Sequence, residues 1–299
     1  MEMTYAWLVV NGFIQSEKFM QIFAWLVRAA EKQGCYLEMK TNTDLLPALV
    51  MQEKMILPAQ RPDFVLFWDK DVRLAMLLEK NGFRLFNSAK SIEICDDKAR
   101  TYLELLGCGI RMPETVIGPK TFLEQGYPDL DFVSGIEERL GYPMVVKECY
   151  GSFGQQVYLV KNRDEISAVL KEIKNRPCLF QKYIAASRGH DIRIQMAGNQ
   201  PVAAMHRYNE HDFRANITNG GSMEPYEPDE AQIQMAQKAV SKLGLDFAGV
   251  DILFGEDGEP VLCEVNSNAH FVNIWKCTGV DAGEAILKHC LNAVRESSS

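Results

Sequence analysis

Asp251 and Glu264 lie in two short apolar segments near the end of this 299-residue chain. The segments, residues 250–254 and 261–266, flank the pair Asp257-Gly258, which is typical of a two-residue type I′ hairpin turn. With that pair at the centre of the turn, residue 251 faces residue 264, and the Cβ atoms of such cross-strand partners lie about 5 Å apart. The sequence therefore predicts two carboxylates on the same face of one hairpin.

The acidic pair on this hairpin favours a metal site. Asn266 follows Glu264 by two residues, so its side chain projects from the same face. The flanking residues are apolar, so the other face is expected to be buried, and the two negative charges repel each other unless a cation lies between them. A set of carboxylate and amide oxygens favours Mg²⁺ over Zn²⁺. The alternative is a solvated hairpin with incidental acids, and the hairpin alone leaves both interpretations open.

The composition argues against several other classes of protein. The net charge is −8 and no Lys/Arg-rich run occurs, which argues against nucleic-acid binding. The eight cysteines are widely spaced and form no C-x-x-C pair, as expected for reduced thiols and not for a disulfide or zinc framework. The N-terminus has no basic region before its short apolar run, so we expect no signal peptide, no membrane span and a cytoplasmic protein.

Strand and helix patterns alternate in residues 1–90. Residues 5–10 and 62–68 have the pattern of buried strands, and apolar residues at helical spacing lie between them. This pattern predicts a small, Rossmann-like parallel α/β domain, in which ligands bind at the carboxyl ends of the strands. Those ends are at Asn11 and Asp69.

Two further domains are predicted, at 91–184 and 185–299, which makes the chain an α/β (α+β) protein of three parts. In the first of them an apolar strand ends at Lys147 and is followed by a glycine-bearing loop at 151–154. A lysine at a strand end suits phosphate binding, and the glycines let the loop approach an anion and close as a lid. The alternative is a surface hairpin with an ordinary lysine, because the loop matches neither the P-loop nor the dinucleotide fingerprint.

Arginine residues gather in the last predicted domain. Asp191 and Arg193 share one face of a strand, where they either pair with each other or face a ligand. Arg207 and Arg214 belong to the polar segment 207–222, whose length without regular structure marks it as a functional candidate. Guanidinium groups bind phosphate or carboxylate bidentately. In this acidic chain, Arg193 and Arg207 are therefore predicted to hold a substrate carboxylate, together with the N-terminal strand ends.

In their order along the chain, these motifs resemble those of the ATP-grasp ligases, and most closely the RimK-type and LysX-type amino-acid ligases. The motifs are Lys98, Lys147 with its glycine loop, Gln181–Ile184, Asp191–Arg193, Asp212–Asn216, Asp251 and Glu264–Asn266. The resemblance covers roughly residues 95–275, and it implies an ATP-grasp fold behind an N-terminal Rossmann-like pre-ATP-grasp domain.

The resemblance also implies roles for individual residues. It places the ATP phosphates on Lys98, Lys147, Gly151, Ser152, Gly154, Arg214 and Asn216, the adenine on Gln181, Lys182, Tyr183 and Ile184, and the ribose on Asp191. It implies Mg²⁺ binding by Asp251, Glu264 and Asn266, and catalytic roles for Lys147, Arg207 and Arg214. The acceptor is expected to contact Arg193, Arg207, Asn268, His270, Asn11 and Asp69. Residues 267–271, Ser-Asn-Ala-His-Phe, depart from the Ala-Ser-Pro-Gly of the RimK type.

The predicted function is that of an ADP-forming carboxylate–amine ligase, which makes an amide or peptide bond through an acyl phosphate. Its expected cofactors are ATP and two Mg²⁺ ions, with Mn²⁺ as a substitute. Its expected partners are a small-molecule or peptide carboxylate and an amine such as glutamate or another amino acid, and we also allow for a homo-oligomer. Two alternatives remain open: a catalytically silent ATP-binding regulatory module, and a kinase that stops at phosphoryl transfer.

Overall fold

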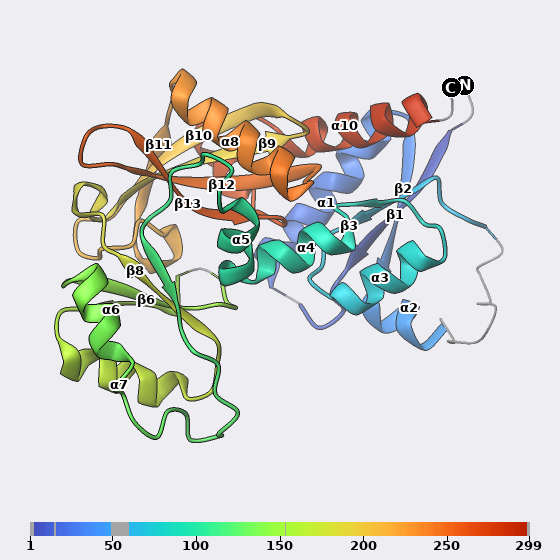
Figure 1. Ribbon diagram of the computed structural model, residues 1–299. Coiled ribbons are helices and arrows are strands. Elements are labelled where there is room, and N and C mark those ends of the chain that lie inside the picture. Colours follow the sequence, from blue (N-terminus) through green and yellow to red (C-terminus); the bar gives the residue numbers. More distant parts are fainter. Residues whose placement is uncertain (1–2, 15, 49–59, 153, 298–299) are drawn as a thin grey trace.

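The computed structural model describes residues 3–14, 16–48, 60–152 and 154–297 (Figure 1). These residues form three sheets, one with parallel pairing and two with antiparallel pairing. Each sheet lies within one of the three predicted segments, although the division into domains remains a prediction. The mixed α/β character expected from the sequence is confirmed.

The first sheet is parallel and has the order β2-β1-β3-β4. Its strands are β1 (Thr4–Val10), β2 (Cys35–Thr41), β3 (Phe64–Phe67) and β4 (Leu85–Phe86), and its helices are α1 (Glu17–Lys32), α2 (Asn42–Ala48) and α3 (Val72–Lys80). The central strand β3 is apolar and buried throughout, and β1 is so from Ala6 to Val10, because both faces of these strands are covered.

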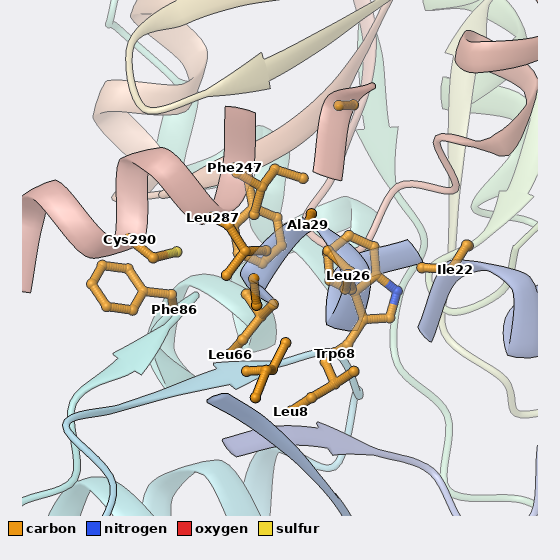
Figure 2. Packing of buried hydrophobic residues seen from close by; sticks show 14 of the residues in the cluster. Leu8, Ile22, Leu26, Ala29, Leu66, Trp68, Phe86, Phe247, Leu287 and Cys290 are labelled. Atoms are coloured by element: carbon orange, nitrogen blue, oxygen red, sulfur yellow. The ribbon is translucent and has the colours of Figure 1, made fainter. Parts of the chain in front are cut away.

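The end of the chain returns to this first sheet. Helices α9 (Val272–Thr278) and α10 (Ala282–Ser297) follow the last strand, and α10 packs along α1. Figure 2 shows the resulting cluster, in which Leu8, Leu66 and Trp68 of the first segment meet Phe247 and Leu287 of the last. This shared core fixes the carboxyl ends of β1 and β3 against the third sheet.

The second sheet has the order β5-β8-β6-β7 and antiparallel pairing. It contains β5 (Thr115–Ile117), β6 (Met144–Glu148), β7 (Val157–Val160) and β8 (Cys178–Lys182), with α6 (Val133–Leu140) and α7 (Arg163–Ile173) packed on one face. The side chains of β6 alternate, so that Val146 enters the apolar cluster under these helices while Val145 and Lys147 face the opposite side.

The third sheet has the order β11-β10-β9-β12-β13. Its strands are β9 (His190–Ala197), β10 (Gln200–Tyr208), β11 (Ser222–Pro225), β12 (Phe247–Phe254) and β13 (Pro260–Asn266). Helices α4 (Ala89–Asp96), α5 (Lys98–Leu105) and α8 (Glu230–Leu243) cover the apolar face, and short 3₁₀ turns η1 (Ala185–Ser187) and η2 (Ile217–Asn219) lie in the loops. The other face carries charged side chains.

The hairpin of β12 and β13 brings Asp251 opposite Glu264 as predicted, but by a different route. The predicted two-residue turn is wrong: Phe254 pairs with Pro260, one residue away from the predicted register. Gly258 adopts a φ of 83° in the resulting longer loop, a conformation that glycine favours. A bulge directly after Asp251 then shifts the register back. The two deviations compensate, so the acidic pair is preserved.

The cysteines and the lengths of the helices bear on two further expectations. All eight cysteines are free thiols. Within the part of the chain that the structure describes, no helix is both long enough and apolar enough to span a membrane.

Candidate functional site

A cleft of about 900 Å³ lies between the second and third sheets. Almost all of the residues predicted to bind nucleotide or metal line it. They are Lys98, Lys147, Gly151, Ser152, Gly154, Gln181, Lys182, Tyr183, Ile184, Arg214, Asn216, Asp251 and Glu264. Residue 153 of the predicted glycine loop lies outside the described residues. The fold therefore collects on one surface the motifs that are spread over more than half of the chain.

One end of this cleft is lined by apolar side chains. Val145 and Leu253 line it from the second and third sheets, and the strand end at Tyr183 and Ile184 lies beside them. Gln181 is fully buried and donates a hydrogen bond through Nε2 to Thr115 Oγ1 (2.9 Å), which fixes its side chain. Apolar walls with a few placed polar groups suit a planar heterocyclic base.

The other end of the cleft is cationic. Lys98 Nζ donates to the carbonyl oxygen of Gly151 (3.0 Å), and Arg214 Nη1 donates to that of Gly154 (2.5 Å). Lys147 Nζ lies 3.9 Å from Cys263 Sγ. Two predicted phosphate ligands thus bind carbonyl oxygens of the glycine loop. Phosphate oxygens carry more negative charge than these carbonyl oxygens, so those of an anionic ligand can take their place as acceptors for Lys98 and Arg214.

Gly154 is required for this arrangement. Its φ is +71°, and a Cβ built there would lie 2.5 Å from Asn216 Oδ1. A larger residue would therefore strain the backbone at this φ and would require the Asn216 side chain to move. This close contact links the two loops that were predicted separately to cover the phosphate end.

The carboxylate of Asp251 is bound by two arginines. Arg193 donates to both of its carboxylate oxygens (2.6 Å each), and Arg207 Nη2 lies 3.0 Å from Oδ2. Burial opposes the ionised form of Asp251, but the positive charges of Arg193 and Arg207 outweigh it and hold its pKa below the usual value. Glu264 Oε1 lies 3.5 Å from Lys98 Nζ. The expectation of two uncompensated carboxylates is wrong, because cations from other strands and from α5 neutralise them.

Asp191 is not placed to bind ribose. Its two carboxylate oxygens accept hydrogen bonds from Arg207 Nε (2.6 Å) and Nη2 (2.7 Å), and it does not line the cleft. The pairing of Asp191 with Arg193, one of the two alternatives left open by the sequence, does not occur, since Arg193 pairs with Asp251 on the neighbouring strand. Asp191, Arg193, Arg207 and Asp251 form one buried ion-pair network on adjacent strands.

The predicted metal ligands suit Mg²⁺ in their chemistry. No group of three or more His, Cys, Asp or Glu side chains with metal-binding geometry occurs among the described residues, and the predicted set contains two acids and an amide. Asn266 Nδ2 is buried and has no hydrogen-bond partner among the described residues, so none of them engages this side chain through that atom. Carboxylate and amide oxygens are the ligands that Mg²⁺ accepts. The assignment of Asp251, Glu264 and Asn266 remains a proposal.

A second, larger cleft of about 1860 Å³ adjoins the first. All six residues predicted to contact the acceptor line it, namely Asn11, Asp69, Arg193, Arg207, Asn268 and His270. Gly151, Ser152, Asn216 and Glu264 line both clefts, so the two spaces meet at the glycine loop and the acidic hairpin.

The second cleft contains polar groups that are fixed by neighbours from the first sheet. Asn11 Nδ2 donates to Asp69 (3.2 Å), and Asn268 Nδ2 donates to the backbone carbonyl of Asp69 (2.8 Å). Burial raises the pKa of Asp69. Burial, helped by the charges of Lys18 and Arg193, lowers the pKa of His270 to about 3, so that this imidazole is neutral at physiological pH.

Several lining residues were not anticipated from the sequence. Lys18 and Phe19 of α1 and Trp68 after β3 face the second cleft. Lys18 is a cation in the first turn of a helix that follows a strand end, and this position could have suggested a ligand contact. It was not singled out because the helix was recognised from its apolar pattern, which begins only at Phe19. Trp68 was predicted to lie in a buried strand. Its ring is indeed buried, but that prediction gave no indication of a role for its indole N–H.

The chain is similar to a known protein family in sequence and to several solved structures in fold. Residues 95–290 match the family model of the RimK-like ATP-grasp domain. Uncharacterized protein MG012 homolog of Mycoplasma pneumoniae is 35% identical over 220 residues, which are 73% of this chain and 76% of that protein. N-acetylaspartylglutamate synthase A of Homo sapiens is 34% identical over 226 residues, or 75% of this chain and 56% of that synthase. Probable alpha-L-glutamate ligase of Citrobacter koseri is 38% identical over 214 residues, or 70% of this chain and 68% of that ligase.

Among solved structures, the fold resembles that of ATP-grasp ligases over nearly the whole chain. D-alanine–D-alanine ligase from Bacillus anthracis in complex with ATP superposes with a TM-score of 0.74 at 20% identity, covering 98% of this chain and 99% of that one. A RimK domain ATP-grasp protein from Sphaerobacter thermophilus superposes with a TM-score of 0.70 at 21% identity, covering 96% and 100%. The predicted ATP-grasp fold is confirmed.

Proposed function

Since this chain belongs to the RimK-like ATP-grasp family of ADP-forming ligases, we propose that it joins a small carboxylic acid to the amino group of glutamate through an acyl phosphate. The observation that carries this proposal is the junction of the two clefts at Glu264 and the glycine loop. A nucleotide in the first cleft and an acid in the second would meet there. We also propose residues 1–90, 91–184 and 185–299 as the domains that form these walls.

Adenine would lie at the apolar end of the first cleft and the phosphates at the cationic end. Lys98, Lys147 and Arg214 would bind the phosphates, which keeps the nucleotide pointing at the second cleft. Mg²⁺ bound by Asp251, Glu264 and Asn266 would supply positive charge to the phosphate oxygens. The two-ion stoichiometry and replacement by Mn²⁺ are parts of the same proposal.

The reaction takes place in two steps. A carboxylate oxygen of the acid attacks the γ-phosphorus, the bond to the β,γ-bridging oxygen breaks, and ADP leaves with that electron pair. The amine nitrogen then attacks the acyl carbon, inorganic phosphate leaves with the oxygen that came from the acid, and the amine loses a proton to form the amide. Lys147 and Arg207 would stabilise the charge that develops during these steps, and closure of the glycine loop would exclude water from the acyl phosphate.

Glutamate is proposed as the amine from the names of two relatives, and the second cleft separately offers an acceptor for the ammonium group of an amine. The names of the human and Citrobacter koseri relatives both contain glutamate. In the second cleft, Asn268 Oδ1 is buried and has no donor among the described residues, while its Nδ2 is fixed on Asp69. An amide oxygen held in this way is a ready acceptor for an ammonium group.

The experiment that tests the proposal is a panel of carboxylic acids with ATP, Mg²⁺ and hydroxylamine, in which acyl phosphates are trapped as hydroxamates. Each acid is then tested with glutamate and other amino acids for ADP release. A ligase requires both acid and amine for sustained turnover, whereas a kinase releases ADP with the acid alone. Nucleotide binding without hydroxamate or acid-dependent ADP across the panel would favour the regulatory module instead.

Lys147→Met is expected to weaken ATP binding roughly tenfold and to lower kcat about 100-fold. The reason is that its ammonium group would contact phosphate oxygens both before and during transfer. Calorimetry with ATP gives the affinity, and steady-state ADP release gives kcat. Lys171→Met, at an exposed position on α7, is the matched control. Unchanged affinity and rate in Lys147→Met would place this lysine outside the site.

A further inference from the structure

We propose that Asp69 binds the ammonium group of the amine substrate, with Asn268 as a second acceptor, so that the N-terminal segment selects amines that enter the second cleft as cations. This inference deepens the proposed function and rests on it. It assigns a role to a residue outside the matched family domain, residues 95–290. From the sequence, the strand end at Asp69 was instead expected to help hold a substrate carboxylate.

The charge of Asp69 lacks a counterion among the described residues. Three carboxylates of the described residues line the second cleft. Asp96 pairs with Lys70. Glu264 pairs with Lys98 at 3.5 Å. Asp69 is only 6% exposed, and no Lys, Arg or His of the described residues lies within ion-pair distance of it. A buried charge without a counterion is costly, so a cation bound beside Asp69 would be stabilised.

Neutral donors hold the Asp69 carboxylate in place. Its Oδ1 atom accepts hydrogen bonds from the backbone N–H of Lys70 (2.7 Å) and from Asn11 Nδ2 (3.2 Å). These donors orient the carboxylate but bring no positive charge. Burial raises the pKa of Asp69, and the negative charge of Asp71 adds to this effect. An ammonium group at hydrogen-bond distance would act in the opposite direction, because a positive charge favours the ionised carboxylate.

Asn268 adds an acceptor on the same wall. Its Nδ2 donates to the backbone carbonyl of Asp69 (2.8 Å), which fixes the amide group. Its Oδ1 is buried and has no hydrogen-bond partner among the described residues. An amide oxygen can only accept, and an ionised carboxylate of a ligand has no proton to donate to it. Both Asp69 and Asn268 therefore select for N–H donors, and an ammonium group brings several of them.

The backbone on either side of Asp69 fixes this wall near the place of chemistry. Trp68, directly before it, stacks its ring on Phe247 at 5.1 Å within the cluster shown in Figure 2. Lys70, directly after it, places Nζ 3.4 Å from Ser152 Oγ. Ser152 lines both clefts. An amine held at Asp69 would thus lie on the side of the second cleft that leads to the junction, where the acyl phosphate is expected.

The test uses two amines, of which only one is charged. At neutral pH the amino group of L-glutamate is an ammonium ion, whereas hydroxylamine is largely uncharged and needs no ammonium site. Each amine is supplied with ATP, Mg²⁺ and the best acid of the panel, and ADP release gives kcat and the KM for the amine. Calorimetry of the full chain with L-glutamate and with glutarate, which lacks only the amino group, is carried out with ADP and Mg²⁺ and does not depend on turnover.

Asp69→Asn is expected to raise the KM for glutamate roughly 10- to 100-fold, the range of one charged hydrogen bond. The hydroxylamine reaction and the KM for ATP should change by about threefold or less, because asparagine keeps an acceptor for Asn11 and only the charge is lost. In calorimetry, the wild type should prefer glutamate over glutarate by roughly 10- to 100-fold, and Asp69→Asn should reduce this ratio to about threefold or less.

Two further variants separate a contact from a general effect of charge. Asn268→Leu, which keeps the size but removes the amide, should raise the KM for glutamate by about 3- to 10-fold, the range of one neutral hydrogen bond. Asp71→Asn is the matched control, because it removes a neighbouring carboxylate that does not line the cleft, and asparagine can still cap α3. Its constants should stay close to those of the wild type.

The inference is overturned if the wild type binds glutamate no more tightly than glutarate, or if Asp69→Asn keeps the wild-type KM for glutamate and the wild-type ratio. Equal losses with glutamate and hydroxylamine in Asp69→Asn would also overturn it, because they would show that Asp69 does not act on the charged amine. If no acid of the panel gives ADP with either amine, the proposed function fails instead, and the calorimetric ratio still decides the role of Asp69.

Discussion

Glu264→Gln is expected to lower ligase turnover by about 10³-fold while the protein remains folded. Glu264 is proposed to hold Mg²⁺ at the junction of the two clefts, and glutamine keeps its size but removes its charge. The fold should tolerate the change because the carboxylate is partly exposed and its ion pair with Lys98 is long, at 3.5 Å. Steady-state ADP release and a thermal melt measure the two effects. Asp257→Asn, at the exposed tip of the same hairpin, is the matched control.

Near-normal turnover in Glu264→Gln, or full activity of the wild type without any divalent cation, would contradict the metal assignment. Asp251→Asn is expected to be equally inactive but also less stable than the wild type. Its carboxylate compensates Arg193 and Arg207, and asparagine leaves both charges without their partner. Mutual repulsion of two uncompensated carboxylates would instead have predicted a gain in stability.

Arg207→Met is expected to lower the free energy of unfolding by about 3–5 kcal/mol, the range for breaking a buried ion pair from one side. Arg207 is only 3% exposed and lies between Asp191 and Asp251, so its removal leaves two buried carboxylates with reduced compensation. Urea denaturation measures the loss. Adding Asp191→Asn to this variant should recover part of the stability, because one of the stranded charges is then gone.

Arg111→Met is the control for this experiment, because Arg111 pairs with Asp257 at the exposed tip of the acidic hairpin. Its unfolding midpoint should stay close to that of the wild type, as for most exposed ion pairs. A loss in Arg207→Met no larger than in this control, or no recovery in the double variant, would contradict the buried network.

The acidic hairpin shows how far sequence reasoning extends. The facing of Asp251 and Glu264 was predicted correctly because strands have a period of two and the segment had two apolar strands around a glycine turn. The turn was predicted wrongly and the bulge after Asp251 was not predicted, and the two resulting register shifts cancel. Local signals thus located the pair, whereas its exact geometry depends on how β12 also pairs with β9.

The ion-pair network shows where local reasoning ends. Asp191 and Arg193 are two residues apart, so the sequence suggested that they pair with each other or face a ligand. Each instead binds a partner on an adjacent strand, because cross-strand neighbours lie closer than residues i and i+2 along one strand. The strand order β10-β9-β12 decides these pairs. Lys18 was missed because only the fold brings α1 to the cleft that Arg193 also lines, 175 positions away in the sequence.

The most direct test of the central claim follows one oxygen atom through the reaction. An acid that gives ADP in the panel is labelled with ¹⁸O in its carboxylate and converted to the amide with unlabelled ATP in unlabelled water. If the carboxylate attacks the γ-phosphorus to form an acyl phosphate, mass spectrometry of the released inorganic phosphate will show one ¹⁸O atom for each amide formed. Phosphate without ¹⁸O, formed together with the amide, would contradict the account.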